Sequence, residues 1–169
     1  MNAVVVAASR HGSTREIAQV IADELRRAGI ETALRDARTV EEIGGYDAVI
    51  LGSAVYMGNW LPEARRFGEH NLTQLTTVPL WLFSSGPLGA DDPQPHGDPE
   101  RISDLLRNLR PREHKVFAGK LDKRGLGFGE RLAVKAVKAQ EGDFRDWDAV
   151  RGWAHAIADA LTTGATVRA

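Results

Sequence analysis

Small hydroxylated residues and glycines gather at three places where an apolar run ends. The three stretches are SRHGST at 9–14, GSAVYMGNW at 52–60 and SSGPLG at 84–89. Hydroxyl and backbone N–H groups at such turns can bind a phosphate or the polar edges of a ring. The first stretch is the strongest phosphate candidate, because a helical pattern begins directly after it. The start of a helix presents unpaired N–H groups and the positive end of the helix dipole.

The residue types in the first stretch favour an anchor over a catalytic centre. Ser9, Ser13 and Thr14 offer hydroxyls, and Gly12 lets the backbone bend close to a ligand. An alternative is a capping box, in which Ser13 caps its own helix and Glu16 reaches back. That alternative leaves the other hydroxyls and the glycine unexplained. A Walker P-loop and a GxGxxG fingerprint are both absent, so we predict a phosphate that is held and not transferred.

The second and third stretches add apolar surface beside the hydroxyls. Tyr56 stands in a turn next to Gly58, where a planar ring with polar edges could lie on it. Trp81 and Phe83 alternate within the third run, so we expect both in the core. The three stretches together predict one site for a phosphate-bearing, partly apolar ring.

Other chemistry finds little support in the composition. The 169 residues contain no cysteine, which excludes disulfides, thiolate metal ligands and cysteine nucleophiles. The histidines are scattered without metal-ligand spacing, and no GxSxG elbow is present, so we expect no metal. A net charge of −1 gives no electrostatic reason to expect nucleic acid.

Apolar runs and helical patterns alternate along the chain, which predicts parallel β-α units in an α/β fold. Strands are expected within the runs 3–8, 30–37, 46–56, 78–89 and 114–119, the fourth of which ends in a turn of small residues. Helices are expected at 13–28, 61–71, 98–109 and 146–161. Gly29 would end the first, Pro62 suits the first turn of the second, and Asp146 would cap the last. Ligands of such sheets bind beyond the carboxyl ends of the strands, where the three stretches lie. We expect one domain over 1–163 and a disordered tail over 164–169. With no signal-peptide pattern and no apolar span, a cytoplasmic location is expected.

Several stretches resemble the flavodoxin-domain family. They are ASRHGSTREIAQVIADEL, YDAVILGSAVYMGNWLPEARRF, PLWLFSSGPLG and GDFRDWDAVRGWA. Together they are most similar to the branch that includes the menaquinone-dependent protoporphyrinogen dehydrogenases. The resemblance implies a flavodoxin-like three-layer α/β/α fold with a five-stranded parallel sheet in the order 2-1-3-4-5.

The resemblance also implies an FMN site built from the three stretches. The phosphate contacts would come from Ser9, Arg10, His11, Gly12, Ser13 and Thr14. One ring contact surface would comprise Ser53, Ala54, Val55, Tyr56, Met57 and Gly58, and the other Ser84, Ser85, Gly86, Pro87, Leu88 and Gly89. No catalytic side chain can be named from the sequence, because the flavin would carry the redox chemistry.

Three functions remain open from the sequence. The first is an FMN-dependent oxidoreductase that oxidises protoporphyrinogen IX and reduces a quinone. The second is a flavodoxin-like electron carrier or quinone reductase that uses FMN or a deazaflavin coenzyme and acts on another small molecule or a redox protein. The third is a cofactor-free interaction module. The near-neutral charge weakens the carrier role, because small carrier flavodoxins are strongly acidic.

The stretch 119–147 is the remaining open question. Arg131, Lys135 and Lys138 form one helical stripe, and Leu126, Ala133, Val134 and Val137 form another. Residues 120–140 could therefore contact a membrane surface at its inner face or a quinone. Alternatively, they form an amphipathic helix that covers the sheet. The oligomeric state does not follow from the sequence.

Overall fold

The computed structural model describes residues 1–56, 58–86, 102–122 and 141–166. Of residues 164–166 it describes the backbone alone. The strands are β1 (Asn2–Ala8), β2 (Glu31–Asp36), β3 (Ala48–Tyr56), β4 (Asn59–Trp60), β5 (Leu80–Gly86), β6 (Glu113–Ala118), β7 (Lys120–Leu121) and β8 (Gly142–Asp143). The helices are α1 (Ser13–Arg27), α2 (Pro62–His70), α3 (Leu72–Leu75), α4 (Ser103–Leu109) and α6 (Trp147–Thr166).

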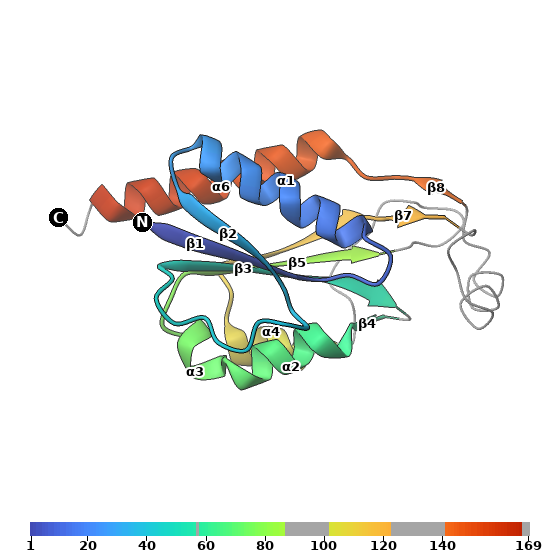
Figure 1. Cartoon of the computed structure of the whole chain (residues 1–169), viewed down its shortest axis with the longest axis horizontal. Coiled ribbons are helices and arrows are strands. Elements are labelled where there is room, and N and C mark those ends of the chain that lie inside the picture. Colours follow the sequence, from blue (N-terminus) through green and yellow to red (C-terminus); the bar gives the residue numbers. More distant parts are fainter. Residues whose placement is uncertain (57, 87–101, 123–140, 167–169) are drawn as a thin grey trace.

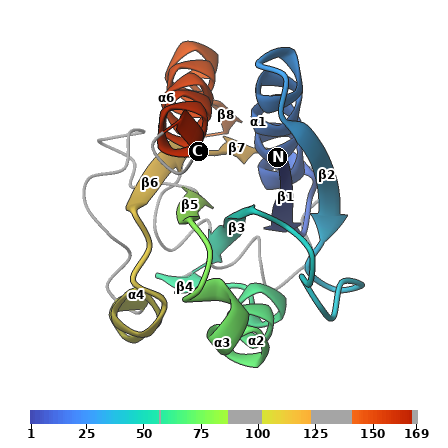
Figure 2. The ribbon, with the colours of Figure 1, turned by 90° about the vertical axis from the view of Figure 1, so that its left-hand side faces the viewer.

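The main sheet has the order β2-β1-β3-β5-β6, and these neighbours pair in parallel. Counting only these five strands in chain order, the arrangement is 2-1-3-4-5, as predicted. Helices α1 and α6 cover one face, and α2, α3 and α4 cover the other, so the molecule has three layers (Figures 1 and 2). The predicted flavodoxin-like α/β fold is confirmed.

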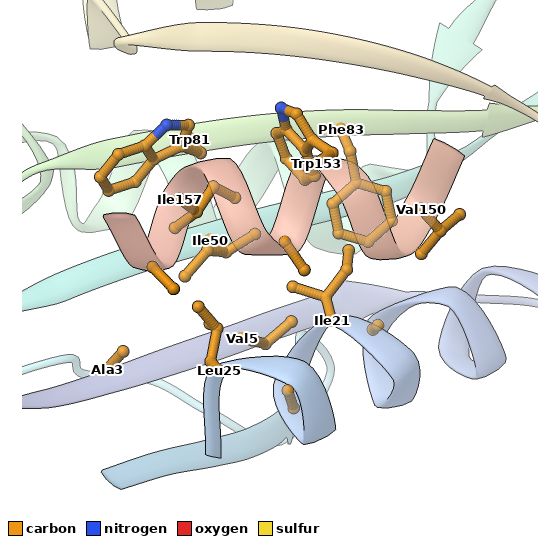
Figure 3. Close-up of a cluster of buried hydrophobic side chains, with 14 of the residues drawn as sticks. Ala3, Val5, Ile21, Leu25, Ile50, Trp81, Phe83, Val150, Trp153 and Ile157 are labelled. Atoms are coloured by element: carbon orange, nitrogen blue, oxygen red, sulfur yellow. The ribbon is translucent and has the colours of Figure 1, made fainter. Parts of the chain in front are cut away.

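The central strands are buried on both faces, which explains why they read as continuous apolar runs. On one face, Val5, Ile50 and Phe83 pack against the apolar stripes of α1 and α6 (Figure 3). On the other face, the alternate residues pack against α2 and α4. Trp81 lies in the first of these two cores together with Phe83, which confirms the core role predicted for both side chains.

The ends of the helices follow the predicted signals. Gly29, at φ +83°, follows the C-cap residue Ala28 of α1 in a left-handed conformation that suits glycine. Pro62 is the first residue of α2, where its missing N–H costs nothing. The Asp146 carboxylate accepts hydrogen bonds from the N–H groups of Asp148 and Ala149 at 3.0 and 2.9 Å, so it caps α6 as expected.

Two short pairings were not predicted. β4 folds back antiparallel on the end of β3, with Gly58 at φ +76° in the turn between them. β7 pairs antiparallel with β8 through Lys120–Asp143 and Leu121–Gly142, beyond the carboxyl edge of the sheet (Figure 1). Strands of two residues carry no periodic pattern, so their pairing depends on tertiary contacts.

The domain boundary predicted at residue 163 falls within the last helix. Helix α6 continues to Thr166, and residues 167–169 lie outside the described part of the chain. Among the described residues, no helix is long and apolar enough to cross a membrane. The segment 123–140, which carries both helical stripes proposed from the sequence, also lies outside the described residues.

Candidate functional site at the carboxyl edge of the sheet

The first turn, residues 9–14, connects β1 to α1 and is held by its own polar atoms. The Gly12 N–H donates to Oγ of Ser9 at 3.1 Å, and the Gly12 carbonyl accepts from the Glu16 N–H at 2.9 Å. Gly12 has φ +88°, a conformation that side chains rarely adopt. The glycine therefore serves the turn as the sequence suggested.

The capping box that was the alternative explanation is not formed. Gly12, and not Ser13, is the N-cap of α1, and no side chain caps this terminus. Oγ of Ser13 instead accepts a hydrogen bond from the N–H of Lys120 at 3.2 Å, and Glu16 pairs with Arg145 at 2.5 Å. The first turn of α1 thus keeps backbone N–H groups that receive no cap from the side chains the structure describes.

Thr14 is the second residue of α1 and only 2% of it is exposed. Within the described residues, its hydroxyl is assigned no hydrogen bond. Among the described residues, the fully buried side-chain oxygen that has no hydrogen-bond partner belongs to Glu63, so the Thr14 hydroxyl oxygen still reaches solvent at the start of the helix. Its position beside the uncapped helix terminus fits an anionic ligand.

The first and second turns meet at Tyr56, the last residue of β3. The Arg10 guanidinium lies over the Tyr56 ring, with Cζ 5.0 Å from the ring centre. The His11 ring stands edge-on to the same ring at a centroid distance of 6.4 Å. Two residues of the predicted phosphate turn therefore fix the aromatic side chain of the predicted ring site.

The serine hydroxyls of the second and third turns have partners inside the protein. Ser53 is fully buried, and its Oγ accepts from the Leu61 N–H at 3.0 Å. Ser84 is also fully buried, and its Oγ accepts from Nε1 of Trp60 at 2.7 Å. These hydroxyl bonds stabilise the two turns. Ser53 and Ser84 can therefore offer a ligand mainly their backbone N–H and carbonyl groups.

His114 extends the Ser84 contact into β6. Its Nε2 lies 2.8 Å from Oγ of Ser84, and its ring stands edge-on to Trp60 at 6.3 Å. Because the Ser84 hydroxyl accepts from Trp60, its single proton can be donated to an unprotonated Nε2 of His114. Sequence reasoning missed this chain, since its three members come from three different strands.

The ends of β3, β5 and β6 approach one another closely at two glycines. A Cβ atom on Gly86 would lie 2.9 Å from Cβ of Val55, and one on Gly119 would lie 3.1 Å from the Gly86 carbonyl. Side chains at these positions would separate the strand ends. The edge is thus a tightly packed backbone surface, as a planar ligand between two turns requires.

The remaining predicted residues are placed as follows. Ala54 and Ser85 are buried, Val55 is half-buried, and Gly58 has open space around a notional Cβ. Met57, Pro87, Leu88 and Gly89 lie outside the described residues, so their predicted contacts remain predictions.

The β7–β8 pairing forms a further wall that the sequence did not predict. It places Lys120 against Ser13 and Arg145 against Glu16. From the sequence, the stretch GDFRDWDAV, which contains β8 and Arg145, indicates only a family resemblance. A local pattern could not assign its arginine, because the partner lies 129 residues away in the chain.

The described residues fit a phosphate-bearing planar cofactor. The uncapped terminus of α1, the left-handed Gly12 and the unbonded Thr14 hydroxyl suit a phosphate. Tyr56 and the closely packed strand ends suit a ring.

Comparison with known proteins agrees with this geometry. The flavodoxin domain family model matches residues 4–148. The chain belongs to this family. The matched residues of the flavodoxin domain include α1, nearly the whole main sheet and the start of α6.

The flavodoxin domain is also similar over nearly its whole length to a curated enzyme. It is 26% identical to the protoporphyrinogen IX dehydrogenase [quinone] of Escherichia coli strain K12, over 94% of this chain and 95% of the relative. The same values hold for the protein of that name from Escherichia coli O157:H7.

Solved structures with the same fold include two flavodoxins. Oxidised flavodoxin 2 from Bacillus cereus gives a TM-score of 0.60 at 19% identity, covering 96% of this chain and 99% of that one. A cysteine-to-serine mutant of flavodoxin from Pseudomonas aeruginosa gives 0.59 at 17% identity, covering 96% and 99%. Rubredoxin oxygen:oxidoreductase from Desulfovibrio gigas gives 0.63 at 17% identity, covering 96% of this chain and 36% of that one.

Proposed function

We propose that this flavodoxin domain binds FMN at the carboxyl edge of its sheet, oxidises protoporphyrinogen IX and passes the electrons to a quinone. The observation that carries the proposal is the similarity to the Escherichia coli dehydrogenase, which extends over 94% of this chain. The uncapped, hydroxyl-bearing turn at 9–14 supports the cofactor assignment. The substrate assignment rests on the relative alone.

In this proposal, the first turn holds the phosphate. The N–H groups of Ser13 and Thr14, at the start of α1, would donate to phosphate oxygens, and the Thr14 hydroxyl would find there the partner it lacks among the described residues. Oγ of Ser9 already accepts from Gly12, so it would shape the turn while donating its own proton to the phosphate. The turn needs no lysine, because nothing is transferred from the phosphate.

The second and third turns would orient the ring. Tyr56 is fixed by Arg10 and His11, so binding of the phosphate and placement of the aromatic surface involve one connected group. The buried Ser53 and Ser84 hydroxyls hold the backbone of both turns at a fixed separation. Bound FMN would supply the acceptor for the electrons of the substrate.

The test is the absorption spectrum of the purified protein before and after addition of FMN, followed by activity assays. We expect a yellow protein that takes up one FMN and oxidises protoporphyrinogen IX when a menaquinone analogue is present. A protein that takes up no flavin would contradict the proposal. FMN uptake with rapid quinone reduction but no porphyrinogen oxidation would support instead a quinone reductase or electron carrier.

Two parallel measurements refine the assignment. Fluorescence titration with FMN and with a deazaflavin coenzyme separates the two cofactors, and we expect FMN to bind more tightly. Sedimentation with anionic lipid vesicles tests the proposed membrane contact of 120–140 from the cytoplasmic side. Protein that stays in the supernatant at low salt would exclude that contact.

A further inference from the structure

Arg145 is a buried cation close to the first turn. It lies between β8 and α6, and only 4% of its side chain is exposed. Its guanidinium stacks on the Trp147 ring, with Cζ 4.5 Å from the ring centre. Arginine is rarely buried to this degree unless its charge is paired, so its partners identify its role.

The guanidinium spans two elements that are far apart in the sequence. Nε and Nη2 bind the two carboxylate oxygens of Asp143, at 2.7 and 2.5 Å. Nη1 binds the Glu16 carboxylate at 2.5 Å and lies 3.4 Å from the Ser13 carbonyl. Nε and Nη2 of the guanidinium thus bind the end of β8, and Nη1 binds the first turn of α1.

The Glu16 carboxylate matters because of where it stands. It lies one turn from the uncapped terminus of α1, where the proposed function places a phosphate. An unpaired carboxylate there would repel a bound phosphate, and the helix dipole would stabilise both anions at the same terminus. Arg145 neutralises Glu16 from the side and turns it toward β8.

We propose, on the basis of the proposed FMN site, that Arg145 is a positioning residue for the cofactor phosphate. It acts through Glu16 and Ser13 and does not touch the phosphate itself. A second consequence is that β8, together with Lys120 of β7 on the Ser13 hydroxyl, is fastened to the same turn. The position of the β7–β8 pair and the occupancy of the phosphate turn are therefore linked.

A purely structural ion pair would affect stability alone, so the test compares two flavins that differ by the phosphate. We expect Arg145→Met to raise the Kd for FMN about tenfold in fluorescence titrations, as the loss of a charge-assisted contact would. The Kd for riboflavin should stay within about twofold. Adding Glu16→Gln to this variant should restore most of the FMN affinity, because the unpaired carboxylate is then gone.

The chain offers a matched control at the other end of α1. Arg151 of α6 pairs with the buried Glu24 at 3.8 Å. Glu24 stands near the C-terminal end of α1, away from the first turn that holds Glu16. Arg151→Met likewise removes a guanidinium that pairs with a glutamate of α1, and we expect it to leave the ratio of the two Kd values unchanged. If Arg145→Met fails to fold, Arg145→Gln is measured in its place with the same expectation.

The outcomes separate the two proposals. Wild-type protein that binds no FMN overturns the proposed function. Wild-type protein that binds FMN, with an unchanged ratio of Kd values in the Arg145 variant or no recovery on Glu16→Gln, overturns only the role of Arg145. A tenfold, phosphate-dependent loss that Glu16→Gln reverses supports it.

Discussion

Helices α1 and α6 lie side by side on one face of the sheet and both begin at its carboxyl edge, but they begin differently (Figure 1). The Asp146 carboxylate closes the start of α6 with two hydrogen bonds. The start of α1 has a left-handed glycine and no side-chain cap. Because a helix gains about 1 kcal/mol from a good cap, the open terminus forgoes stability that a neighbouring helix of the same protein obtains.

In the proposed function, the difference is that the start of α6 is closed by its own aspartate, whereas the start of α1 would be closed by the phosphate of the ligand. An aspartate cap supplies a permanent negative charge to the N–H groups of α6. The N–H groups of α1 are left for a charge from outside the chain, and the only carboxylate of its first turn, Glu16, is drawn aside by Arg145. Four experiments test this contrast, from the largest expected effect to the smallest.

Thr14→Asp should reduce the contrast by placing a second carboxylate, besides Glu16, at the start of α1. The new charge would stand against the phosphate, so we expect the Kd for FMN to rise at least about thirtyfold, the loss of about 2 kcal/mol of charge-assisted bonding. Riboflavin binding should change much less, and fluorescence titration measures both. FMN affinity equal to that of the wild type would show that the phosphate lies elsewhere.

Gly12→Ala tests the backbone of the open terminus. No heavy atom lies within 4 Å of the added Cβ, so the cost comes from φ +88° alone and should be about 1–2 kcal/mol in urea unfolding. Gly152 in the middle of α6 is the matched control, since its Cβ would also meet open space at an ordinary φ. Gly152→Ala should stabilise the protein by about 0.5–1 kcal/mol, and destabilisation by both variants would contradict the conformational explanation.

Asp146→Ala removes the cap of α6. We expect a loss of about 1 kcal/mol in the free energy of unfolding, because two N–H groups lose their acceptor. The Kd for FMN should not change. A weaker FMN affinity at unchanged stability would mean that the start of α6 also serves the ligand.

The smallest effect concerns Asp143 of β8, which binds the same Arg145 side chain that pairs with Glu16 of α1. The hydrogen bonds from the Arg145 side chain lower the pKa of Asp143 in the folded protein. Its contribution is therefore fully present above the unfolded-state pKa of about 4 and is lost as the pH falls through the folded value. With 40% of the side chain exposed, we expect less than about 1 kcal/mol. Urea unfolding of Asp143→Asn between pH 7 and pH 3 should show a flatter acid decline than the wild type.

The sequence predicted those parts of the molecule that local patterns determine. Continuous apolar runs identified the central strands, and Gly29, Pro62 and Asp146 marked the ends of helices correctly. The family resemblance predicted the strand order, which the sheet confirms. The core roles of Trp81 and Phe83 followed from simple alternation.

The site was less predictable, because its interactions are not local. Glu16 stands at the spacing of a capping box, but its partner is an arginine from the opposite part of the sequence. Ser84 remains a predicted ring contact, and its hydroxyl meets a tryptophan and a histidine from other strands, which no local pattern indicated. The residue types indicated the chemistry of the edge, whereas the partner of each side chain depended on the folded arrangement.

The packing of α1 against α6 has a consequence for synthesis on the ribosome. Strands β2, β1 and β3 can pair once the first 56 residues have emerged, and Ile17, Ile21 and Leu25 can then pack on these strands, but their partners on α6, Val150 to Leu161, are made much later. We expect the nascent chain to pass through a stage in which these strands are paired but the part of the core that α6 covers is still exposed, a surface that chaperones bind. The ligand turn would form early, whereas Arg145 and the helix that completes its surroundings are among the last parts to arrive.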